Sequence, residues 1–207
     1  MGLHQASEVR NGSILRRSTA WVVPLLMTAI SLLVSFAGTE GQSRLRYERQ
    51  DIAEGELWRL VTGHFAHLGL SHMLLNIAGL ALVWLLVGGA WMLWQWAFIT
   101  FISLAFIDLG FWFLDPGLNW YVGLSGLLHS MLVAGIVGRI RDAPGESLAL
   151  GAIVLAKIAW EQLAGPLPGS ESSAGGAVVV NAHLYGAMAG IIAAGALRLR
   201  PAPRAPI

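Results

Sequence analysis

Six apolar stretches alternate with short polar segments along this chain. A helix needs roughly 20 residues to cross the hydrocarbon core of a bilayer, and an open strand there leaves its backbone polar groups unpaired. We therefore predict an all-α polytopic membrane protein with six transmembrane helices between residues 20 and 197. The predicted spans are 20–37, 72–91, 94–114, 121–140, 146–164 and 177–197.

Composition supports a membrane protein. Of the 207 residues, 56% are hydrophobic and only 12% are charged, whereas about 25% of residues are charged in typical soluble domains. No basic stripe beyond the arginines that flank the spans indicates nucleic acid as a partner. The chain has no cysteine, which excludes disulfides, thiolate metal sites and a cysteine nucleophile.

The first span has an alternative interpretation. Arg16 and Arg17 precede an apolar run that ends in Ser35-Phe36-Ala37, a pattern that also occurs in cleavable signal peptides. The apolar run is long for a signal peptide, so a retained first helix is the favoured interpretation.

Arginine placement predicts the orientation, because short cytoplasmic segments are enriched in Lys and Arg. With the N-terminus inside, one side holds Arg10, Arg16, Arg17, Arg139, Arg141, Arg198, Arg200 and Arg204. The other side holds Arg44, Arg46, Arg49 and Arg59, all in a loop at 38–71 that mixes charges with apolar residues. We expect a bacterial inner-membrane protein, with cytoplasmic segments at 1–19 and 198–207 and an interfacial external loop at 38–71.

Polar residues inside spans are candidates for function, because they are costly in lipid. Ser125 lies between Gly123 and Gly126, and His183 follows Ala182. Each lies about five or six residues, or ~7–9 Å, below the external end of its span at the rise of an α-helix. A serine hydroxyl bonded to its own helix, or a histidine bonded between helices, is the alternative interpretation of each.

Stripes of small residues run beside both polar side chains. Gly126, Ser130, Ala134 and Gly138 recur at every fourth position, as do Ala182, Gly186, Gly190 and Ala194. Such stripes permit close packing of helices in lipid. We therefore expect the two helices to touch, with Ser125 and His183 within reach of a hydrogen bond, as a serine nucleophile requires.

Three other polar residues are expected to assist Ser125 and His183. His72 and Asn76 share a helical face and can donate to an oxyanion, while Asn76 can equally be a packing hydrogen bond. His129, one turn after Ser125, is a rival base that we interpret as a support or pocket residue.

Lys157 and Glu161, four residues apart, are interpreted as a structural ion pair. Asp108 has no evident partner in the sequence. His64 and His67 are expected to face headgroups or water, without enough ligands for a metal.

These residues carry a resemblance to the rhomboid intramembrane proteases over about residues 55–195. The matching motifs, in order, are Trp58-Arg59 with His72 and Asn76, then Gly123, Ser125 and Gly126, then Ala182-His183 with Gly186 and Gly190. An aromatic residue usual in the family four positions after the serine is replaced by His129. That variant is similar to the rhombosortase branch.

The resemblance implies a Ser125–His183 catalytic dyad without a required carboxylate, and an oxyanion hole from His72, Asn76 and the Ser125 amide. It implies pocket roles for Trp58 and Arg59 and no cofactor or metal. The implied substrates are membrane-anchored proteins, in the rhombosortase branch those with a C-terminal Gly-Gly, helix and basic tail. A rhomboid-like binder without activity and a small proton-coupled transporter using Asp108, Lys157 and Glu161 are the competing interpretations.

Overall fold

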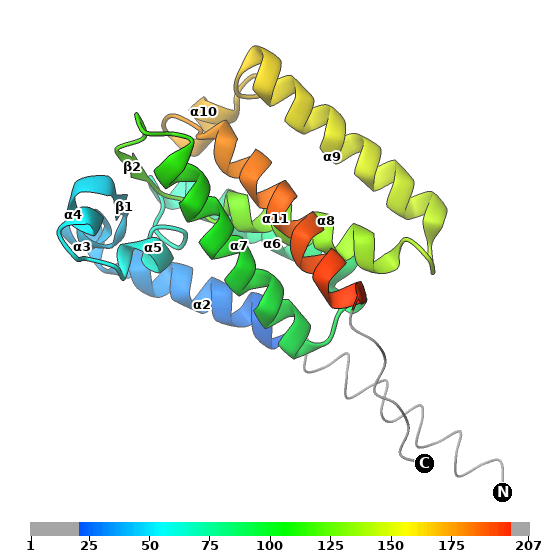
Figure 1. Cartoon of the computed structure of the whole chain (residues 1–207). Helices are drawn as coiled ribbons and strands as arrows, with labels where there is room; N and C mark the ends of the chain where they lie inside the picture. The colour runs from blue at the N-terminus through cyan, green and yellow to red at the C-terminus, as the bar shows by residue number, and fades with distance from the viewer. Residues whose placement is uncertain (1–20, 200–207) are drawn as a thin grey trace, which may run out of the picture.

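The computed structural model describes residues 21–199, and the predicted cytoplasmic segment 1–19 and all but two residues of the tail lie outside this range. The regular elements of the described chain are helices apart from two short strands. Six helices have 15 or more residues within this range: α2 (Val22–Phe36), α6 (Leu70–Val87), α7 (Leu93–Phe113), α8 (Ser125–Arg139), α9 (Pro144–Ala164) and α11 (Val180–Leu199). The predicted all-α class is therefore confirmed (Figure 1).

The predicted span bounds agree with these helices to within a few residues. Within residues 21–199, four helices are long and apolar enough to cross a membrane, namely α6 with the short helix η1 (Gly88–Ala90), α7, α9 and α11. The helices α2 and α8 have 15 residues each, fewer than the ~20 that a perpendicular span requires. The largest departure is in α8, which begins at Ser125 rather than at residue 121 because Trp120–Tyr121 forms strand β2.

The long helices expose apolar side chains outward, as a protein in lipid does. Leu33, Leu85, Phe101 and Leu155 are each at least 67% exposed, and helices that are hydrophobic all round are typical of membrane spans. Of the four long spans, α11 is the most buried and α9 the least. In Figure 1 α9, in yellow, lies at the edge of the bundle.

The segment before α6 is folded into short elements: α3 (Gly38–Leu45), β1 (Tyr47–Glu48), α4 (Arg49–Ala53) and α5 (Arg59–Thr62). Tyr47 and Tyr121 are paired in the antiparallel strands β1 and β2. Leu57, Trp58 and Val61 are exposed, which suits a segment lying in the membrane interface.

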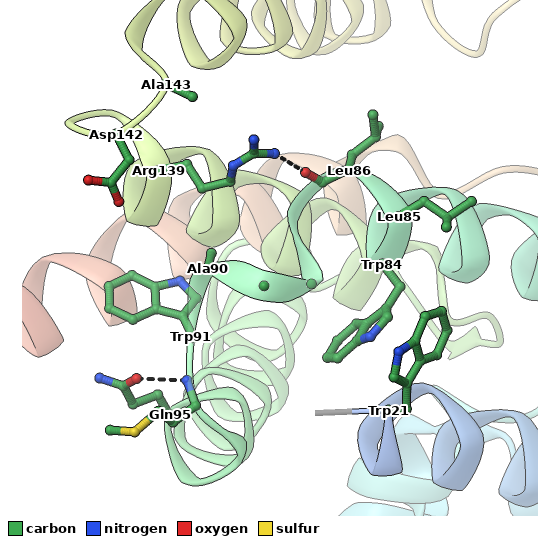
Figure 2. A pocket seen from close by; sticks show the side chains of 13 residues that line it. Trp21, Trp84, Leu85, Leu86, Ala90, Trp91, Gln95, Arg139, Asp142 and Ala143 are labelled. Atoms are coloured by element: carbon green, nitrogen blue, oxygen red, sulfur yellow. Dashed lines mark hydrogen bonds between the residues drawn. The ribbon is translucent and has the colours of Figure 1, made fainter. Parts of the chain in front are cut away.

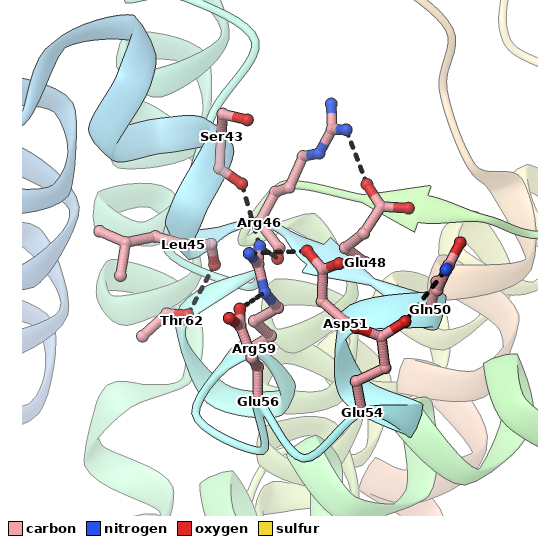
Figure 3. A network of polar contacts seen from close by, with 10 residues as sticks. All are labelled: Ser43, Leu45, Arg46, Glu48, Gln50, Asp51, Glu54, Glu56, Arg59 and Thr62. Atoms are coloured by element: carbon pink, nitrogen blue, oxygen red, sulfur yellow. Dashed lines mark hydrogen bonds and ion pairs between the residues drawn. The ribbon is translucent and has the colours of Figure 1, made fainter.

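Arg59 holds this segment together. Its guanidinium lies 2.7 Å from Asp51 Oδ2 and 2.6 Å from Glu56 Oε2, as Figure 3 shows. It also donates to the backbone carbonyls of Ser43 and Arg46. The side chain is 6% exposed. These contacts give the Trp-Arg motif a structural role in the loop.

Two histidines of this segment are buried, so the expectation that they face headgroups or water is wrong. His64 is fully buried and lies 3.1 Å from Asp108 Oδ1 on α7. Asp108, which lacked a partner in the sequence, is thus half of a buried pair between the loop and the bundle. His67 is 2% exposed, and its ring packs edge-on against His72, with centroids 5.2 Å apart.

Candidate active site

Ser125 is the first residue of α8, at the end of a turn that follows strand β2. Gly123 in this turn has φ +132°, a conformation that L side chains rarely adopt. A Cβ at Gly123 would also lie 3.0 Å from Cε1 of His72. The serine therefore stands at a helix start, not about five residues inside a helix as predicted.

His183 comes from α11, in its first turn. The backbones of α8 and α11 approach so closely that a Cβ on Gly186 would overlap the carbonyl oxygen of Gly126, and one on Gly190 would overlap that of Ser130. The small-residue stripes thus fit a direct helix contact. This contact brings His183 Nε2 to 3.0 Å from Ser125 Oγ.

A carboxylate fixes the tautomer of His183. Glu161 Oε2, from the last turn of α9, lies 2.9 Å from His183 Nδ1. A carboxylate only accepts, so Nδ1 carries the hydrogen and Nε2 presents a lone pair. Ser125 Oγ accordingly donates to His183 Nε2. The sequence singled out Glu161 as part of an ion pair and missed this contact.

His129 packs against one face of the His183 ring. Its imidazole is stacked on that of His183, with centroids 4.3 Å apart and planes 23° apart. His129 Nδ1 donates to the carbonyl of Ser125 at 2.7 Å. The ring is therefore held by its own helix and presents a face, not a nitrogen, to His183.

His72 lies beside the turn that carries Ser125. Its Nδ1 accepts from the amide of Leu68 at 3.3 Å, which leaves the hydrogen of the neutral ring on Nε2. That nitrogen is next to Gly123, 3.2 Å from the position of a Cβ there. A donor at this place suits an oxyanion formed at Ser125.

Asn76 is buried one turn further along α6, and its Nδ2 donates to the carbonyl of His72 at 3.0 Å. This bond occupies one of its two amide hydrogens. This contact lies within α6, the helix that also carries His72.

A family model for the rhomboid domain matches residues 54–200. The chain belongs to the rhomboid family. Members of this family are generally intramembrane serine proteases. A search of curated proteins finds no match to this chain.

Within this rhomboid domain, the start of α11 is anchored to the end of α7. Asp115 accepts from Asn181 Nδ2 at 2.8 Å and from the Tyr185 hydroxyl at 3.0 Å. Asn181 precedes His183 by two residues, so this anchor holds the turn that carries the histidine. Trp58 and Arg59, in contrast, have their described contacts inside the loop before α6.

Outside the spans, burial shifts two ionisable groups of the rhomboid site. Burial, aided by the neighbouring His72, lowers the pKa of His67 from 6.5 to about 4, so its ring is neutral at pH 7. Burial also raises the pKa of Tyr121. The hydroxyl of Tyr121 therefore stays protonated and donates to the carbonyl of Gly123 at 2.5 Å, bracing the turn before Ser125.

One cluster in the site has the side chains that bind metals. Donor atoms of His129, Glu161 and His183 lie within 4.8 Å of one another. The ammonium of Lys157, however, is 2.7 Å from Glu161 Oε1, and a cation at this distance opposes a second one. Stacked imidazoles also direct their in-plane lone pairs past each other, so the arrangement does not suit a shared ion.

A cavity of about 710 Å³ lies at the opposite end of the bundle from Ser125. Figure 2 shows its lining, with Trp21 and Trp84 on one side and Trp91 and Arg139 on the other. Arg139, the last residue of α8, donates to the Leu86 carbonyl and pairs with Glu146. Tryptophan and arginine together are typical of a membrane interface, so we assign this end to the level of the lipid headgroups.

Proposed function

We propose that this rhomboid protein is an intramembrane serine endopeptidase with Ser125 as nucleophile and His183 as general base. The observation that carries the proposal is the 3.0 Å contact between Ser125 Oγ and His183 Nε2, with a carboxylate on the far nitrogen. A serine becomes a nucleophile when such a base takes its proton. A non-catalytic binder has no use for this arrangement.

In the proposed reaction, His183 Nε2 takes the Ser125 hydroxyl proton while Oγ attacks the scissile carbonyl carbon. The resulting oxyanion faces the first amides of α8, which have no partner within the helix, and the Nε2–H of His72. The imidazolium then gives its proton to the leaving amine as the C–N bond breaks. Water then attacks the acyl-enzyme carbonyl carbon while His183 Nε2 takes a proton from it, and the imidazolium returns that proton to Ser125 Oγ as the ester bond breaks and the acid leaves.

We further propose that α2 and α8 are spans in addition to the four longer helices, giving six. Neighbouring helices and a locally thinner bilayer accommodate short spans at modest cost. Arginine placement supports cytoplasmic termini in a bacterial inner membrane and an active site that opens to the outer side.

The proposed substrates are exported proteins with a C-terminal Gly-Gly, a helix and a basic tail. Support comes from the similarity to the rhombosortase branch, including His129 after the serine, and from the physics of such a tail. Glycine disfavours helix by ~1 kcal/mol relative to alanine, so a Gly-Gly pair unwinds readily where a scissile bond must be extended. The basic tail stays cytoplasmic by the positive-inside rule.

Two experiments test these proposals. A serine-reactive fluorophosphonate should label the wild type and should not label Ser125→Ala. The control variant Ser172→Ala, which removes an exposed serine on α10 (Ser170–Ala174), should still be labelled. Labelling that persists in folded Ser125→Ala would contradict the nucleophile.

A co-expressed reporter with the Gly-Gly tail should be shortened by the wild type and not by Ser125→Ala. Unchanged cleavage after Gly-Gly is replaced by Leu-Leu would remove the tail hypothesis and leave a protease for other single-span substrates. Cleavage of no membrane-anchored reporter would favour the binder.

A further inference from the structure

A buried charged pair on α9 faces the histidine of the site. Glu161 is 3% exposed, and burying a carboxylate in a membrane bundle is costly unless it has partners. We infer that Glu161 is a positioning residue for the proposed reaction, whose carboxylate holds His183 in the tautomer that accepts the Ser125 proton. This inference rests on the proposed function, and it makes the site a Ser125–His183–Glu161 triad.

The two oxygens of Glu161 have different partners. Oε1 accepts from Lys157 Nζ at 2.7 Å, and Oε2 accepts from His183 Nδ1 at 2.9 Å. An ion pair with a purely structural role would need only the first contact. The second contact connects the carboxylate to the serine through the imidazole of His183. Glu161 binds its Nδ1 and Ser125 binds its Nε2.

The carboxylate is needed because of Lys157. Without Glu161, this ammonium would stabilise the His183 tautomer that has its hydrogen on Nε2. Lys157 Nζ lies 3.3 Å from His183 Nδ1. If Nδ1 accepted a hydrogen from this ammonium, the ring proton would reside on Nε2, opposite Ser125 Oγ. Such a ring cannot take the serine proton. Glu161 prevents this by accepting from both Lys157 and the Nδ1–H.

The proton count of the step follows from this arrangement. Before attack, His183 carries one hydrogen, on Nδ1, and the bond to Glu161 holds it there. After attack, the ring carries a second hydrogen on Nε2 and a positive charge, which the adjacent carboxylate stabilises. Glu161 stays ionised throughout and exchanges no proton, so its role is orientation and electrostatics.

The test uses the full-length protein in detergent or liposomes, with the Gly-Gly reporter tail as substrate and fluorophosphonate as a second acylating probe. Glu161→Gln keeps the side-chain size and removes the charge. We expect kcat and the rate of fluorophosphonate labelling to fall by about 10²-fold or more, with KM little changed, because substrate does not contact Glu161. Glu161→Asp should recover part of the rate.

A double variant separates orientation from structure. Adding Lys157→Met to Glu161→Gln removes the competing donor, so kcat should rise relative to Glu161→Gln alone. A merely structural pair predicts that the double variant recovers thermal stability, because the unpaired ammonium is removed, while the kcat of the folded protein is the same in both variants. Glu146→Gln, on the same helix but exposed and paired with Arg139, should retain the wild-type rate.

The outcomes are distinct from those for the proposed function. If Glu161→Gln or, where that variant is unfolded, the Lys157→Met/Glu161→Gln double variant keeps kcat and labelling within about threefold of wild type while Ser125→Ala is inactive, the triad is overturned and a dyad remains. If folded Ser125→Ala still cleaves, the protease proposal itself fails. An equal loss of kcat in Glu161→Gln and the double variant would overturn the tautomer role assigned against Lys157.

Discussion

The imidazole of His129 lies 4.3 Å from that of His183 and nearly parallel to it. Because His129 Nδ1 is bonded to the Ser125 carbonyl, both its position and its plane are set by α8. A ring that presents its face cannot accept a proton in its own plane from the serine. The stacking contact instead limits the side-chain rotation of His183. It acts together with the hydrogen bond from His183 Nδ1 to Glu161.

We predict that His129→Phe keeps most activity, because a planar ring still stacks on His183. His129→Ala should lower kcat by about fivefold, since about 1 kcal/mol of stacking contact is lost. His183→Ala should abolish cleavage. Initial rates with one reporter compare the three variants, and equal loss in folded His129→Ala and His183→Ala would reopen the choice of base.

The contact between α8 and α11 predicts a strong size limit at Gly186. A Cβ there overlaps the Gly126 carbonyl oxygen, so Gly186→Ala must separate the helices that carry Ser125 and His183. We expect destabilisation by about 1–3 kcal/mol and loss of labelling by fluorophosphonate. Gly195→Ala is the matched control on α11, because a Cβ at that position meets open space. Similar thermal midpoints for the two variants would contradict the close contact.

Much of the fold could be predicted from the apolar pattern, because the bilayer imposes length and helicity on each span. The family could also be predicted, since its motifs occur in order along the chain. The start of α8 differs from the prediction because Tyr121 and Val122 are apolar enough to extend the predicted span. In the structure Tyr121 pairs with Tyr47 in a strand, a contact between distant segments that hydropathy cannot show.

Glu161 was missed for a different reason. Its spacing from Lys157 indicates a self-contained pair, and only its level in the bundle relates it to His183. Glu161 lies three residues before the end of α9, and His183 three residues after the start of α11. Successive antiparallel helices place such residues at one level, so the same depth argument applied to Ser125 could have found it. The burial of His64 and His67 depends on the folded loop and had no such signal.

The buried ring of His67 predicts a loss of stability in mild acid. Its folded pKa of about 4 lies below its ordinary value of 6.5, so between these pH values the unfolded chain binds more protons than the native one. Stability therefore falls as pH decreases from about 6.5 to 4, by up to about 3 kcal/mol. Between pH 6.5 and 4, the thermal midpoint in detergent should drop less in His67→Phe than in the wild type. An equal drop in both proteins would rule out His67 as the cause.

Arg59 should contribute far more to stability than Arg44. Both arginines lie in the loop, and each pairs with a carboxylate one helical turn away. Arg59→Ala leaves two carboxylates and two carbonyls without their shared donor, at a cost of about 2–3 kcal/mol. Arg44→Ala removes an exposed pair with Glu40 and should cost at most about 0.5 kcal/mol. Limited proteolysis of the segment before α6 and thermal unfolding measure both, and equal behaviour would deny Arg59 its anchoring role.

The proposed orientation predicts which loops meet the outer aqueous phase. The chain has no cysteine, so single cysteines report without background. Ser43 is exposed before α6, and only its backbone carbonyl is used by Arg59, so Ser43→Cys should fold. Asp142 is exposed in the connection between α8 and α9, at the end away from Ser125.

An impermeant maleimide should label Ser43→Cys in intact spheroplasts, and Asp142→Cys only after permeabilisation. Glu171→Cys, on exposed α10 beside the start of α11, should behave as Ser43→Cys does. The reverse pattern would put Ser125 and His183 at the cytoplasmic face, where a tail held by basic residues could not present its Gly-Gly pair from the outer side.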